Sequence, residues 1–77
     1  MIDFDLRRKI LQAGYLAEGK EPLGFWSNRH DDSIFLVVFE GDHGIVVHAD
    51  HGCIDQQYDG EELENAIALT GGTFYDG

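Results

Sequence analysis

The chain is poor in cysteine, in proline and in positive charge, and these scarcities exclude several classes of protein. Its 77 residues include one Cys, so no disulfide can form within the chain, and a reducing compartment fits better than secretion. No apolar run approaches the roughly 18 residues that a membrane-spanning helix requires. The basic start of a signal peptide is also absent, so we expect a cytoplasmic protein with no membrane partner.

Positive charge is confined to the first part of the chain. All five Lys and Arg residues lie within residues 1–29, where four acidic residues leave a formal charge of +1. Residues 30–77 contain eleven acidic residues and no Lys or Arg, a formal charge of −11. Because affinity for DNA or RNA comes largely from cations that neutralise phosphates, direct binding of nucleic acid is disfavoured. The hydrophobic fraction of 43% still supports a folded core, and we expect one domain over residues 1–77.

Local signals predict an N-terminal helix at about residues 4–18. Asp3 can cap its start, and Gly19 suits the left-handed position just after its end. Apolar residues recur within it at helical spacing and predict one buried side, which Leu16 would widen. Gly14 is expected to weaken this helix by up to ~1 kcal/mol relative to Ala.

Strand signals dominate the middle of the chain. An apolar run at about residues 33–40 predicts a strand, and residues 45–50 predict its partner in a central hairpin. Residues 41–44 are typical of a four-residue hairpin connection. We interpret residues 25–27 as a short edge strand, and residues 73–75 as either a final edge strand or a flexible tail.

A second helix is predicted at about residues 60–70. Asp59 and Glu62 have the spacing of a capping box in which Asp replaces the usual Ser or Thr. The predicted fold class is therefore α+β, a small antiparallel sheet built on a central hairpin, with a helix near each end of the chain. Because the central strand is apolar on both faces, two helices on one face would leave a patch exposed, which favours a homodimer.

All four histidines and the only Cys lie between residues 30 and 53. His48, His51 and Cys53 form an H-x-x-H-x-C pattern, and zinc binds imidazole and thiolate groups. Either His43 or Asp50 is the candidate fourth ligand, and a site with three ligands would leave room for water. A small zinc-binding domain is therefore one alternative, although no CxxC or HExxH pattern accompanies the set. The leading interpretation includes no cofactor. We expect no enzyme, because no cation stands near the Cys to activate it and no pair of acids is distinguished by its spacing.

The acidic surface is the feature that points to function, since such a surface attracts basic partners. We predict a binding or inhibitor module that occupies the basic, nucleic-acid-binding surface of a partner protein. The predicted contact residues are nine acids and one aromatic anchor: Asp31, Asp32, Asp42, Asp50, Asp55, Asp59, Glu61, Glu62, Glu64 and Trp26. In size, charge and helix–strand content the chain resembles small phage inhibitors such as anti-CRISPR proteins, and nuclease immunity proteins. This resemblance is one of type and assigns no residue. A homodimeric structural subunit is the remaining alternative.

Overall fold

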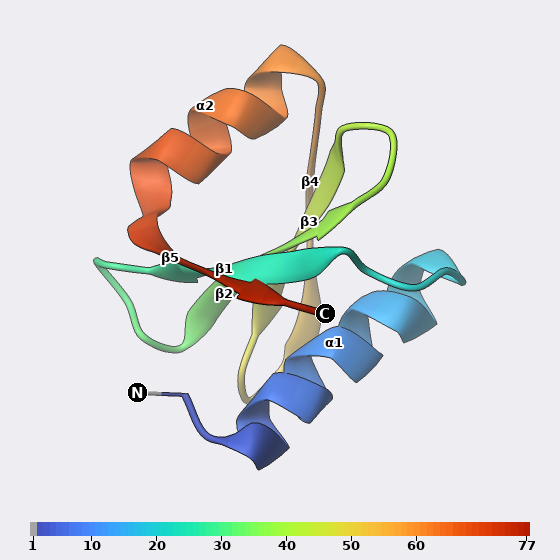
Figure 1. The fold of residues 1–77 in the computed structure, drawn as a ribbon, viewed down its shortest axis with the longest axis vertical. Coiled ribbons are helices and arrows are strands. Elements are labelled where there is room, and N and C mark those ends of the chain that lie inside the picture. The colour runs from blue at the N-terminus through green and yellow to red at the C-terminus, as the bar shows by residue number, and fades with distance from the viewer. Residues whose placement is uncertain (1) are drawn as a thin grey trace.

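Five strands form one antiparallel sheet, and one helix lies on each of its faces (Figure 1). The computed structural model describes residues 2–77. The strand order across the sheet is β4-β3-β2-β1-β5. The elements along the chain are α1 (Phe4–Glu18), β1 (Gly24–Asn28), β2 (Ile34–Phe39), β3 (His43–His48), β4 (Gly52–Asp59), α2 (Glu61–Thr70) and β5 (Gly71–Asp76). The α+β prediction is confirmed, with both predicted helices and the central hairpin present.

Helix α1 begins and ends where the local signals predict. The side chain of Asp3 accepts a hydrogen bond from the backbone N–H of Leu6 at 2.8 Å. Gly19 adopts φ 72°, and its N–H donates to the carbonyl of Tyr15 at 2.7 Å. These two caps satisfy backbone groups that the helix leaves free at its ends. The prediction for Leu16 is wrong, because its side chain is 72% exposed.

The central hairpin is present, but its turn is shorter than predicted. Strand pairing extends to Phe39 opposite His43, so only residues 40–42 connect β2 to β3. Gly44 therefore lies within β3 rather than in a turn. A Cβ atom at this position would come within 2.4 Å of the Leu63 side chain. The glycine is needed here because helix α2 packs directly on the strand, a requirement that turn statistics do not reveal.

Strand β1 is not an edge strand, which corrects the interpretation of residues 25–27. It lies between β2 and β5, with Phe25 opposite Val37 on one side and opposite Tyr75 on the other. The last segment forms the edge strand β5, so the strand alternative for residues 73–75 is confirmed and the flexible tail is not. The N–H of Gly77 also donates to the carbonyl of Leu23 at 2.9 Å, which extends the contact beyond β5.

Alternate residues of the strands supply two separate cores. Because successive side chains on a strand point to opposite faces, β2 contributes to both cores. The α1 face buries Ile10, Phe25, Phe35, Val37, Phe39, Ile45 and Val47. The α2 face buries Leu36, Val38, Val46 and Leu63. The argument for a dimer assumed that both helices lie on one face and leave the other face exposed. Because one helix lies on each face, that argument does not apply, and dimerisation stays a prediction. Among residues 2–77, neither helix is long and apolar enough to cross a bilayer.

Candidate partner-binding site

The nine predicted contact acids separate into groups at opposite ends of the strands. Asp42 lies in the β2–β3 turn, and its carbonyl accepts a hydrogen bond from Gly60 N–H at 2.8 Å, which brings this turn to the start of α2. Asp32 and Asp50 lie at the other end, where Ala49 N–H donates to the Ser33 carbonyl. We define the acidic end of the molecule as Glu18, Glu40, Asp42, Asp59, Glu61, Glu62 and Glu64. The opposite end holds Asp31, Asp32 and Asp50, and Asp55 lies in the middle of β4.

His43 joins three elements at the acidic end. Its Nδ1 atom lies 2.6 Å from Asp59 Oδ1, and its Nε2 atom lies 2.6 Å from Glu18 Oε1. The first contact has hydrogen-bond geometry, whereas the second has the distance of an ion pair without that alignment. This side chain, 15% exposed, thus links the last turn of α1 to β3 and β4.

The capping box predicted at the start of α2 is wrong. The N-cap residue is Gly60, with φ 56°, and no side chain caps the helix. Asp59 is the last residue of β4, and its carboxylate is held by His43 instead. Glu61, Glu62 and Glu64 in the first turn still favour the helix, because negative charge near a helix N-terminus is stabilising by about 0.3–1 kcal/mol each.

The cations of the chain do not neutralise the acidic end. Within residues 2–77, no Lys or Arg lies within 4.0 Å of a carboxylate oxygen, and both ion pairs involve His43. Arg7 donates to the carbonyl of Asp76 and lies over the Tyr75 ring. The Nζ atom of Lys20 lies 5.8 Å from the ring centre of Phe39. Among the described residues, the carboxylates of Glu18 and Asp59 contact the basic side chain of His43, and the other five carboxylates of the acidic end have no basic side chain within 4.0 Å.

Asp31, at the opposite end, has a local structural role. Its carboxylate accepts hydrogen bonds from the Ser33 hydroxyl at 2.6 Å and from the Ser33 N–H at 2.9 Å. These two bonds, the hydroxyl first, lower the pKa of Asp31 below its usual 3.8. The residue thus fixes the approach to β2. Asp32 and Asp50 are exposed.

The predicted metal ligands are not brought together. His43 and His48 stand at opposite ends of β3. His48 and His51 do meet, with ring centres 4.6 Å apart, but the Nδ1 atom of His48 accepts a hydrogen bond from the Asp50 N–H. Cys53 is exposed as a whole residue. The partial loss of solvent around its thiol raises the pKa of that thiol, and the negative charges of Glu18 and Asp55 raise it further. Across residues 2–77, no group of three or more His, Cys, Asp or Glu is arranged to hold a metal ion.

The predicted aromatic anchor is half-buried. Trp26 packs against the α2-side core, and its ring centre lies 5.3 Å from that of Phe74 on β5. Phe74 is the more exposed of the pair, at 39%. The tryptophan therefore contributes mainly to the contact between β1, β5 and α2.

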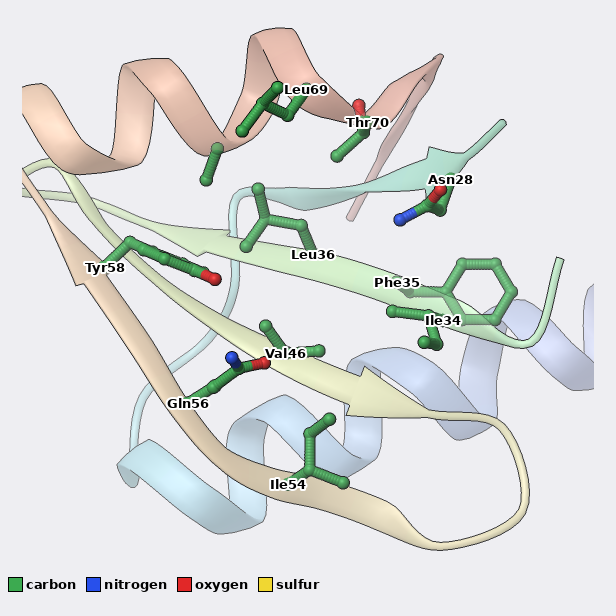
Figure 2. Close-up of a pocket in the computed structure, with 11 residues that line it drawn as sticks. Asn28, Ile34, Phe35, Leu36, Val46, Ile54, Gln56, Tyr58, Leu69 and Thr70 are labelled. Carbon is green, nitrogen blue, oxygen red and sulfur yellow. The ribbon is translucent and has the colours of Figure 1, made fainter. Parts of the chain in front are cut away.

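A hollow between α2 and β4 is the feature that the sequence did not predict. It has a volume of about 250 Å³, and its walls include Leu36, Val46, Ile54 and Tyr58 from the sheet and Leu69 from the helix (Figure 2). Tyr58 and Leu69, with Ala66, also line a second hollow that includes Glu62. We call the two together the α2 groove. The sequence signal for it was the alternation of Ile54, Gln56 and Tyr58, which all line the hollow from one face of β4.

Comparisons with known proteins add no family to this geometry. No protein-family model matches the chain, and neither a curated protein nor a solved structure matches it.

Proposed function

We propose that the chain is a non-enzymatic binding module whose acidic end contacts the basic, nucleic-acid-binding surface of a partner protein. The observation that carries this proposal is the grouping of seven carboxylates around the β2–β3 turn and the start of α2, with no Lys or Arg paired to them within residues 2–77. A surface of one sign attracts partners of the opposite sign and accelerates their association.

The geometry of the acidic end favours competition with nucleic acid for such a surface. Residues three or four positions apart on a helix lie about 5–6 Å apart, so Glu61 and Glu64 form a short row of negative charge. Asp42 and Glu40 extend this charge onto the neighbouring turn. A duplex likewise presents closely spaced negative charges along its backbone. A protein groove that binds phosphates can therefore be occupied by these carboxylates.

Charge reversal at the acidic end tests the proposal. The variant carries Glu61→Lys, Glu62→Lys and Glu64→Lys. The matched control carries Asp32→Lys, Asp50→Lys and Asp55→Lys, three exposed acids outside the acidic end. Both variants change the formal charge from −10 by the same six units. The immobilised proteins are exposed to lysate at about 0.05 M and about 0.5 M salt, since screening rises steeply over this range.

We expect the unchanged chain and the control to retain a basic nucleic-acid-binding protein at low salt. The acidic-end variant should retain at least about tenfold less, and added duplex DNA should release the partner. A Glu61→Gln, Glu62→Gln, Glu64→Gln variant, checked by circular dichroism, separates loss of charge from loss of α2. Equal loss in the acidic-end variant and in the control, or retention unaffected by salt, would contradict the proposal.

A further inference from the structure

The α2 groove leaves apolar surface open beside the acidic end. Leu69 is 75% exposed at its rim, and the small side chain of Ala66 leaves the hollow unfilled. The hollow of about 250 Å³ exceeds the roughly 150 Å³ of an apolar cavity that holds benzene. It therefore has room for one or two large apolar side chains. Burying such side chains is favourable by about 1.5–3 kcal/mol each.

The groove has an axis and two distinct ends. β4 and α2 meet at Gly60 and diverge from there, so the groove widens toward Ile54 and Thr70 (Figure 2). Glu62 lines the narrow part, next to the other carboxylates of the acidic end. The wide part lies beside the C-terminus of α2, which carries about half a negative charge from the helix dipole. The narrow part thus presents the negative charge of Glu62, and at the wide part the Arg29 N–H donates to the carbonyl of Thr70, the last residue of α2.

The charge around the groove restricts what can cover it. No Lys or Arg is among the described residues that line either hollow. Arg29, which packs against Gly71, lies just beyond the wide part. A second copy of this chain would bring a formal charge of −10, and a fatty acid or an anionic membrane would also be repelled. Charge complementarity therefore favours an occupant that is both apolar and cationic.

We infer that the α2 groove binds a cationic amphipathic helix of the partner, with apolar side chains in the hollow and Lys or Arg side chains toward Glu62. This inference rests on the proposed function, because it describes the same partner. Helices pack side by side at about 8–10 Å, so such a helix would lie beside α2 and complete the cover of this face. The acidic end would supply attraction and the groove would supply specificity.

Three synthetic helical peptides of equal length test the inference. One has Leu at helical spacing with Lys elsewhere, one has Ser in place of Leu, and one has Glu in place of Lys. Binding is measured by calorimetry, and backbone amide shifts locate the contact. We expect the Leu/Lys peptide to bind at least about tenfold more tightly than the other two, with shifts at Ile54, Tyr58 and Leu69.

Two matched substitutions place the binding on the groove. Leu69→Ser should weaken the Leu/Lys peptide about tenfold. Leu16→Ser removes a leucine of similar exposure, 72%, from the opposite face and should leave affinity unchanged. Ala66→Phe fills the hollow and should weaken binding as well. Circular dichroism confirms that each variant keeps its fold.

Each other outcome overturns the inference. Equal binding of the Ser/Lys peptide would show that charge alone suffices, and the acidic-end proposal would survive. If the Leu/Glu peptide binds as tightly as the Leu/Lys peptide, the charge of the peptide does not affect binding to the groove. A dimer mass in analytical ultracentrifugation that disappears with Leu69→Ser would identify a second copy as the occupant. Failure of every peptide would also reject the groove, while the lysate experiment would decide the proposed function independently.

Discussion

The two faces of the sheet share the same strands, yet α1 seals one face and α2 leaves the other partly open. Helix α1 has 15 residues and α2 has 10. At about 1.5 Å per residue they are about 22 Å and about 15 Å long. Five strands spaced by about 4.8 Å make a sheet roughly 19 Å wide, so α1 is longer than this width and α2 is shorter. The longer helix covers seven buried core residues on its side of the sheet, and the shorter one leaves a hollow of about 250 Å³ beside β4.

The largest effect is expected from removing an aromatic ring on the sealed face. Phe25 is fully buried, contacts Phe35 edge to face and stacks on Tyr75. Phe25→Ala should lower the free energy of unfolding by about 3–5 kcal/mol, a large share of the stability of a chain of this size. Urea denaturation gives this value. A loss below about 1 kcal/mol would mean that the α1 face is not sealed.

Two neighbouring valines sharpen the comparison. Val47 faces α1 and is 1% exposed, whereas Val46 faces the α2 groove and is 7% exposed. Val47→Ala should cost about 2–3 kcal/mol, from lost transfer energy and a new cavity. Val46→Ala should cost about 1 kcal/mol less, because the space beside Val46 is already open. Equal losses in urea denaturation would indicate that the groove closes in solution.

An intermediate effect is expected at Gly14 on α1. Helix propensity alone predicts that Gly14→Ala stabilises the chain by up to ~1 kcal/mol. In the fold, however, the added Cβ would lie 2.8 Å from Val37 Cγ1 and 3.4 Å from Phe39 Cζ. We expect a net loss of about 1–2 kcal/mol, because overpacking exceeds the gain in propensity. Gln12→Ala, on the exposed side, is the control for propensity. A Gly14→Ala variant that is more stable than the unchanged chain would show that α1 packs less closely on Val37 and Phe39 than the structure indicates.

The smallest effect concerns Cys53, at the margin of the sealed face. Because its folded-state pKa is raised above the usual 9.0, less thiolate is present near neutral pH. Iodoacetamide at pH 8 should therefore react more slowly with the folded chain than with the chain in urea. The free energy of unfolding should fall as pH rises above 9.0, and Cys53→Ser should remove this dependence. Equal reaction rates would place Cys53 outside the influence of the fold.

The sequence predicted those features whose signals are local. Asp3 and Gly19 act within one turn of their own helix, so α1 was predicted with its observed bounds. Asp59 and Gly44 were misassigned because each has a partner far away in the chain. Asp59 pairs with His43 across β4 and β3, and Gly44 makes room for Leu63 of α2. No spacing rule contains such contacts.

The candidate site likewise has one feature that the sequence predicts and another that depends on contacts between distant parts of the chain. Composition alone identified a cation-free region of residues 30–77 and hence an acidic surface. The fold then divided its carboxylates between two ends, because antiparallel strands return the chain to each end in turn.

The sequence by itself determined the fold class, both helices, the central hairpin and the sign of the surface charge. These depend on residue type and on neighbours within one turn or one strand. Only the tertiary structure decided which carboxylates stand together, where β1 lies in the sheet and that α2 leaves a groove beside β4. The reason is that strand order and helix placement minimise exposed apolar surface over the whole chain at once, and no local segment carries that information.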